Sequence, residues 1–144
     1  MADFWYHSGM TKLVSGTISF NDVRVILVMT NTTSDTEKDV DFIADFSTLD
    51  EYDGANYARK ALGSEAVSDD DSNNRTMFDA ADTSWTALGA GARQAQAMLY
   101  YQHVTNDADS VPLMYCESGG FPFTGNGGNV PVTFNASGLG YIAT

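Results

Sequence analysis

The stretch from Ala92 to Ile142 decides the fold of this chain. It opens with ARQAQAMLYYQHV (residues 92–104), resumes after six polar residues with VPLMYC (111–116), and continues with VPVTF (130–134). Apolar and aromatic runs separated by Asn, Asp and Gly are typical of β-strands joined by turns. The stretch therefore predicts three successive strands, the first two paired as a hairpin. A turn at 135–138 leads into a last apolar run at 139–142.

Upstream, the sequence predicts further strands and one helix. The run 23–29 is almost continuously apolar and β-branched, which is typical of a central strand covered on both faces. Ser34 and Glu37 match a capping box, and apolar residues follow with helical spacing, so we expect a short α-helix over 35–48. Short strands are expected at 57–62, with a possible extension through 64–67, and at 77–80 and 85–88. About eight or nine strands and one helix predict a mainly β fold, an antiparallel β-sandwich or small barrel.

The length of 144 residues predicts a single domain preceded by an aromatic arm. Phe4, Trp5 and Tyr6 place three rings beside the N-terminus, and Ser8 and Gly9 could act as a hinge behind them. We therefore divide the chain into an arm, 1–10, and a sandwich-like domain, 11–144. The three rings either pack on this chain's own sheet or contact a neighbouring subunit, and both places are open at this point.

Charge and cysteine content restrict the classes of partner. The net charge is −12, from 19 acidic and 7 basic side chains, so most of the surface would repel a polyanion and nucleic acid is not an expected partner. We expect neither a secretory leader nor a membrane-spanning segment, because no long apolar segment follows a basic start. Cys116 is the single cysteine and is interpreted as a small buried residue.

One acidic segment imitates a metal-binding loop. Asp69-x-Asp71-x-Asn73 copies the opening of a calcium loop, in which oxygen ligands alternate along the chain. The match then breaks, because Asn74 stands where the loop needs glycine and Ala80 where it needs a bidentate glutamate. We interpret 68–74 as a solvated acidic loop, and we expect no metal and no cofactor.

The sequence favours a protein without catalytic residues. His7 and His103 are the only histidines, and neither belongs to a recognised motif. His103 could approach Cys116 across the predicted hairpin, but no oxyanion donor is evident beside them. The chain contains no zinc-protease, dinucleotide-binding or phosphate-loop motif. We therefore expect a non-enzyme.

Three groups of residues have the order and spacing of a known class of protein. They are Glu51-x-x-Gly54-x-x-Tyr57-x-Arg59-Lys60-x-Leu62, Asp79-x-x-Asp82-x-x-Trp85, and Gly127 through Val132-x-Phe134-x-Ala136-x-Gly138. In this pattern, residues 20–142 resemble small structural proteins of tailed-bacteriophage virions. The resemblance implies a β-rich virion protein without catalysis that is present in many copies. Among the roles of such proteins we favour head decoration, or cement.

That role implies a place and partners. The partner would be the major capsid protein, together with neighbouring copies of this chain in a homo-oligomer, for example a trimer. The chain would be made in the host cytoplasm and would lie on the phage head surface, outside the shell and away from packaged DNA. A tail, adaptor or fibre component of the virion and a carbohydrate-binding β-sandwich module remain as alternatives. A flat platform of exposed Trp or Tyr rings would favour the sugar-binding alternative, and rings on an extended terminal arm would favour subunit bridging, with Phe4, Trp5 and Tyr6 as the partner contacts.

Overall fold

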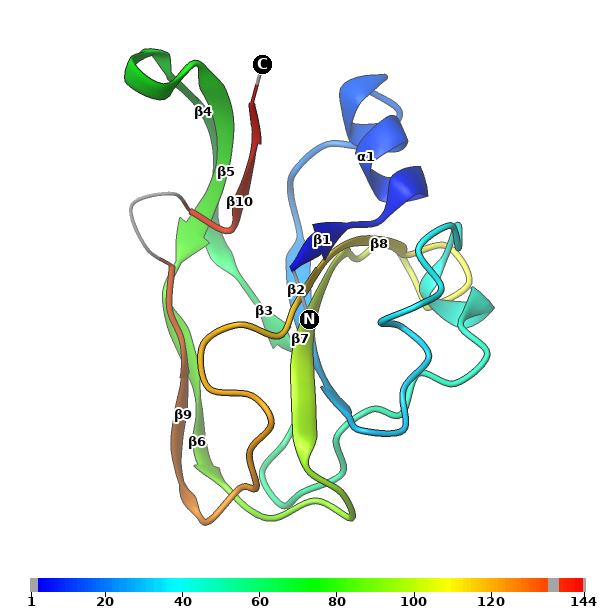
Figure 1. The fold of residues 1–144 in the computed structure, drawn as a ribbon, viewed down its shortest axis with the longest axis vertical. Coiled ribbons are helices and arrows are strands. Elements are labelled where there is room, and N and C mark those ends of the chain that lie inside the picture. Colours follow the sequence, from blue (N-terminus) through cyan, green and yellow to red (C-terminus); the bar gives the residue numbers. More distant parts are fainter. Residues whose placement is uncertain (1–2, 135–137, 144) are drawn as a thin grey trace.

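The computed structural model describes residues 3–134 and 138–143. The fold is mainly β, all strand pairs are antiparallel, and the described residues contain one α-helix (Figure 1). The predicted fold class is confirmed, although the sheets do not close into a complete sandwich or barrel. Most of the turn expected at 135–138 lies outside the described residues.

Ten strands form three sheets in the part of the chain that the structure describes. The strand orders are β1-β8-β7-β2-β3 in the five-stranded sheet, β10-β5-β4 in the three-stranded sheet and β6-β9 in the two-stranded sheet. The helix α1 spans His7–Val14, and 3₁₀ turns lie at Ile43–Asp45 and Asp71–Asn73. The strands are Phe4–Trp5 (β1), Val23–Met29 (β2), Lys60–Ala61 (β3), Gly63–Asp70 (β4), Arg75–Ala81 (β5), Thr83–Leu88 (β6), Ala95–Gln102 (β7), Val111–Cys116 (β8), Gly128–Val132 (β9) and Gly140–Ala143 (β10).

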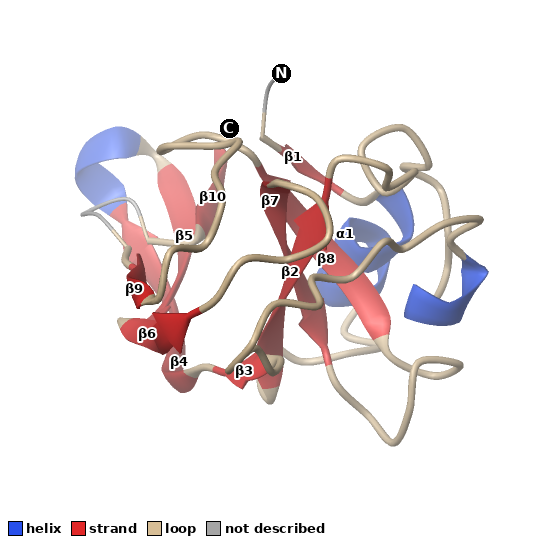
Figure 2. Ribbon diagram, turned by 90° about the horizontal axis from the view of Figure 1, so that it is seen from below, coloured by secondary structure: helices blue, strands red, loops and turns tan. Residues whose placement is uncertain are grey.

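The larger of two hydrophobic clusters lies between the five-stranded sheet and the two smaller sheets, which together form a second layer (Figure 2). Val25 and Leu27 of β2 face Phe78 of β5 and Trp85 of β6 in this cluster. Trp85 is fully buried, and its indole N–H donates a hydrogen bond of 2.7 Å to the carbonyl of Ala58. Burial of these aliphatic and aromatic side chains, with the polar atom of Trp85 hydrogen-bonded, stabilises the packing of the layers.

The opposite face of the five-stranded sheet is covered by residues from the N-terminus and from 40–49. Ile26 and Val28 of β2 are fully buried there, against Tyr6, Ile43 and Phe46. Alternate residues of β2 thus enter different clusters, because successive side chains of a strand point to opposite faces. The prediction that this strand is central and covered on both faces is confirmed.

The helix predicted over 35–48 is wrong, because this segment bonds to distant partners. The Glu37 carboxylate accepts hydrogen bonds from the Thr33 hydroxyl and from the amide and hydroxyl of Ser47, and these bonds hold the pKa of Glu37 below its ordinary value. The Ile43 amide donates to the carbonyl of Ser110 instead of forming a helical bond. The actual helix, α1, has eight residues, and none of the described helices is long and apolar enough to cross a membrane.

Candidate interaction surface

The β4–β5 hairpin projects beyond the packed layers at one end of the molecule (Figure 1). Six of the eight residues of β4 are exposed. β4 is also the last strand of its sheet, so no described strand pairs with its outer edge. Asn74 ends the turn in the left-handed conformation, with φ of 50°, which asparagine tolerates better than most residues. The outer hairpin therefore offers backbone and side chains to a partner without disturbing the core.

The solvated loop predicted over 68–74 is wrong in its first half, because β4 continues to Asp70. Asp70 lies opposite Arg75, and the two side chains form an ion pair of 2.7 Å. The Asn73 amide also donates to Asp70, and the Arg75 guanidinium lies 4.7 Å from the centre of the Tyr141 ring. Because cross-strand pairs of this kind stabilise a sheet, a strand of polar composition is stable here. The sequence feature that could have indicated this hairpin is the polar turn Asp-Ser-Asn-Asn at 71–74, with a run of seven residues on each side, 64–70 and 75–81.

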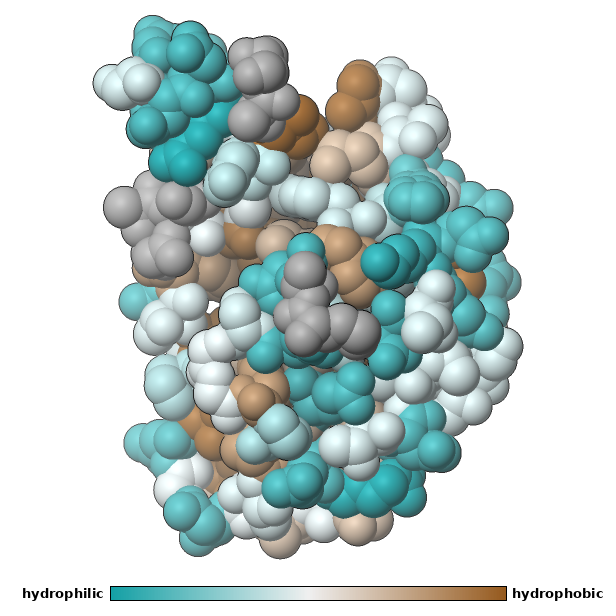
Figure 3. Space-filling view, viewed as in Figure 1, coloured by the Kyte–Doolittle hydropathy of each residue, from teal (hydrophilic) through white to brown (hydrophobic). Residues whose placement is uncertain are grey.

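A shallow hollow of about 330 Å³ lies at the tip of the hairpin, bordered by Asp69, Asp71, Thr76 and Ile142 among others. Within the described ranges, neither the Asp69 nor the Asp71 carboxylate has a hydrogen-bond or ion-pair partner. In the space-filling view the tip of the hairpin, at the upper left, is hydrophilic (Figure 3). Among the residues that the structure describes, no three His, Cys, Asp or Glu side chains are grouped to hold a metal ion.

The N-terminal aromatic residues pack on this chain's own sheet, which is the first of the two places left open by the sequence. Phe4 and Trp5 form β1, opposite Tyr115 and Met114 of β8. Tyr6 is fully buried, and its hydroxyl donates a hydrogen bond of 2.6 Å to the carbonyl of Ser34. Residues 4–6 thus pack on the sheet and α1 continues past residue 10, while the division into an arm, 1–10, and a domain, 11–144, stays a prediction. β8 pairs with Phe4 and Trp5, and Tyr6 is fully buried, but Phe4 and Trp5 keep part of their surface exposed, so contact of these residues with a neighbouring subunit stays a prediction.

His103 and Cys116 lie at opposite ends of the β7–β8 pair. The contact between them that the sequence allowed is therefore not made. Cys116 is opposite Met98, whereas His103 follows Gln102, which pairs with Val111 at the other end. His103 lies five residue steps along the chain from Met98, a distance of about 17 Å in an extended strand. A Cys/His pair is therefore not formed.

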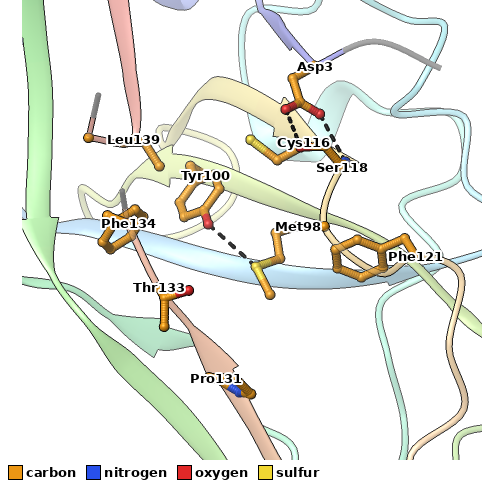
Figure 4. A pocket seen from close by; sticks show the side chains of 12 residues that line it. Asp3, Met98, Tyr100, Cys116, Ser118, Phe121, Pro131, Thr133, Phe134 and Leu139 are labelled. Carbon is orange, nitrogen blue, oxygen red and sulfur yellow. Dashed lines mark hydrogen bonds between the residues drawn. The ribbon is translucent and has the colours of Figure 1, made fainter. Parts of the chain in front are cut away.

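Cys116 instead borders a cavity of about 280 Å³ between β7 and the segment that follows β9 (Figure 4). The Asp3 carboxylate accepts a hydrogen bond of 2.6 Å from the Ser118 hydroxyl, and Tyr100 donates to the sulfur of Met98 at 3.4 Å. Burial raises the pKa of Tyr100, so its hydroxyl stays protonated. The cavity offers a carboxylate, hydroxyl groups and apolar side chains, and it contains no activated nucleophile among the described side chains.

The Cys116 thiol is expected to react slowly. Burial, helped by the nearby charge of Asp3, raises its pKa from 9.0 to about 12. At pH 8 a thiol reagent should therefore modify the native protein about a thousandfold more slowly than the unfolded chain, since the thiolate is the reacting species. The native rate should rise about tenfold per pH unit below that pKa. The double variant Cys116→Ala, Val104→Cys places a thiol at an exposed position and should react at the unfolded rate. Equal rates for native and unfolded wild-type protein would contradict this assignment.

Exposed rings do not form a flat platform on the described surface. The large apolar side chains with strong exposure are Val14, Val67, Val104 and Tyr141, so Tyr141 is the single ring among them. Its face is also occupied by the Arg75 guanidinium. The arrangement that would favour sugar binding is thus not seen in the described residues.

Two of the residues that carry the phage resemblance, Arg59 and Gly54, make close contacts with residues distant in the sequence. Arg59 binds both Glu51 and Asp107, and Gly54 lies so close to Gly89 that a Cβ atom would come within 2.3 Å of its carbonyl oxygen. Comparisons of the chain with protein-family models, with curated proteins and with solved structures find no match. Ala136 of the resembling pattern lies outside the described residues.

Proposed function

We propose that this protein is a non-enzymatic structural protein of a tailed-bacteriophage virion that works by attaching to neighbouring protein subunits. The observation that carries the proposal is the β4–β5 hairpin, which projects from the core with an unpaired edge and an exposed strand. A projecting hairpin with a free edge is a common means of binding another chain. The proposal that the particle is a tailed-bacteriophage virion comes from the resemblance of residues 20–142.

Within the virion, head decoration is the role that we favour. An acidic protein suits the outer face of a shell, where its charge of −12 does not compete with the binding of packaged DNA. A protein that binds only the assembled shell stabilises it by mass action, and several contacts per oligomer raise the total affinity. The partner in this role is the major capsid protein.

Purified particles test the proposal directly. Heads and tails are separated and each fraction is searched for this chain by mass spectrometry, with recovery in the heads as the expected result. Heads stripped of the chain should then lose their DNA at a lower temperature and recover when purified protein is added back. Recovery in the tail fraction alone would support the tail, adaptor or fibre alternative. Absence of the chain from complete particles, together with binding to a glycan array, would overturn the proposal in favour of a sugar-binding module.

A further inference from the structure

The outer edge of β4 is an open pairing site. In an antiparallel sheet, alternate residues of an edge strand direct their N–H and C=O groups away from the neighbouring strand. β4 spans Gly63–Asp70, and no described strand takes these groups. The strand is long enough to pair with a partner segment of ordinary strand length.

The side chains on one face of β4 determine which segment fits. Directly opposed residues of antiparallel strands lie on the same face. Val67 lies opposite Phe78 and Asp69 lies opposite Thr76, so Val67 and Asp69 share the face that Phe78 directs into the core. Val67 nevertheless has 52% of its surface exposed, and Asp69 borders the hollow at the hairpin tip. An added strand would therefore meet one apolar and one acidic side chain, two residues apart.

The negative charge of the hairpin determines which kind of segment can pair with the outer edge of β4. From 63 to 82 the chain has six acidic side chains and a single basic one, Arg75, which already pairs with Asp70. A second copy of β4 would place carboxylates beside carboxylates, which disfavours self-pairing. A segment with Lys or Arg opposite Asp69 would instead find an unpaired carboxylate.

We propose that the open edge of β4 receives an extended, positively charged segment of a neighbouring protein, which adds as a further antiparallel strand. Because every pair in this fold is antiparallel, the segment passes Asp69 before Val67. Its recognition pattern is a basic residue followed two positions later by an apolar one. A second basic residue, two positions earlier, reaches Asp71 at the same hollow. The inference rests on the proposed function and names the chemistry of its partner.

Synthetic peptides test the pattern on the full-length protein. One short peptide contains lysine, lysine and valine at alternate positions with threonine between them, and its matched control carries glutamate in place of each lysine. We expect the lysine peptide to shift the amide resonances of residues 63–70 and to bind roughly tenfold more tightly than the glutamate peptide, a difference that falls in high salt. Only alternate N–H groups of an added strand point towards β4. Of two lysine peptides N-methylated at one or the other set of alternate residues, one should therefore lose binding.

A charge exchange supplies the decisive variant. Asp69→Lys should weaken the lysine peptide roughly tenfold and strengthen the glutamate peptide. Asp39→Lys makes the same change of net charge at another exposed aspartate and should leave both affinities unchanged. Unchanged resonances of Trp85 in both variants show that the core is intact. Equal binding of both peptides, binding that survives N-methylation in both registers, or self-association through β4 in place of peptide binding would overturn the inference.

The search for the chain in head and tail fractions tests the virion role independently of strand addition at β4. Protein found on heads without any peptide binding would retain the virion role and reject the strand-addition edge. Peptide binding by a protein absent from particles would retain the edge and reject the virion role.

Discussion

Replacing Tyr6 with alanine is expected to lower the free energy of unfolding by about 3–5 kcal/mol, the range for removing a large aromatic side chain from a core. Tyr6 has no exposed surface and packs edge-on against Phe4 and Phe46. Its loss also leaves the buried carbonyl of Ser34 without the phenol donor. Denaturant unfolding, followed by far-UV circular dichroism, measures the change.

Two control variants separate the contributions of the Tyr6 ring and its hydroxyl. Tyr6→Phe keeps the ring and should cost about 1 kcal/mol, the contribution of one hydrogen bond. Tyr141→Ala removes an exposed ring and should cost less than the Tyr6→Ala change. Removal of residues 1–8 should destabilise the protein at least as much as Tyr6→Ala, since β1 is lost as well. A truncated protein of wild-type stability would show that the N-terminal residues form a detachable arm after all.

Replacing Arg59 with alanine is expected to cost about 2–3 kcal/mol. Its guanidinium binds Glu51 at 2.8 Å and Asp107 at 2.5 Å, and lies 5.5 Å from the centre of the Tyr101 ring. Burial lowers the pKa of Arg59, but hydrogen bonds to Glu51 and Asp107 outweigh burial and raise the net pKa above its ordinary value. Removing one partner of a buried pair costs about 3–5 kcal/mol, and we reduce that figure because about a quarter of the Arg59 side chain is exposed to solvent.

The matched control for Arg59 is an arginine with an exposed partner. Arg24 pairs with Asp22 at 3.0 Å, and both side chains are at least one-third exposed. Arg24→Ala should therefore change stability by less than about 1 kcal/mol. Arg59→Lys should lie between the two alanine variants, because lysine cannot reproduce the bidentate contacts. Equal costs for Arg59→Ala and Arg24→Ala in urea unfolding would contradict this account.

Most strands could be predicted because their sequences carry enough local information. The run 111–116 has the predicted bounds, and 23–29 is central as its continuous apolar pattern indicated. The helix over 35–48 could not be excluded by local patterns, because the bonds from Glu37 to Ser47 and from Ile43 to Ser110 depend on the folded chain. Tertiary contacts outweighed a weak helical preference there.

The candidate surface was less predictable than the fold. A strand with exposure on both faces lacks the alternation by which strands are recognised, so β4 was only partly expected. Its open edge depends on strand order, which no local pattern encodes. The same is true of the N-terminal rings, since nothing within Phe4, Trp5 and Tyr6 reveals that β8 has room beside it.

The pairing of β1 with β8 has a consequence for biosynthesis. Phe4 leaves the ribosome long before Tyr115, its partner in the sheet, and at ordinary elongation rates the delay is about 5–20 s. During that interval the aromatic residues of the nascent chain have no sheet to cover them and are available to chaperones or to other nascent chains. The five-stranded sheet is completed only late in translation, so the yield of folded protein depends on how well those early residues are protected.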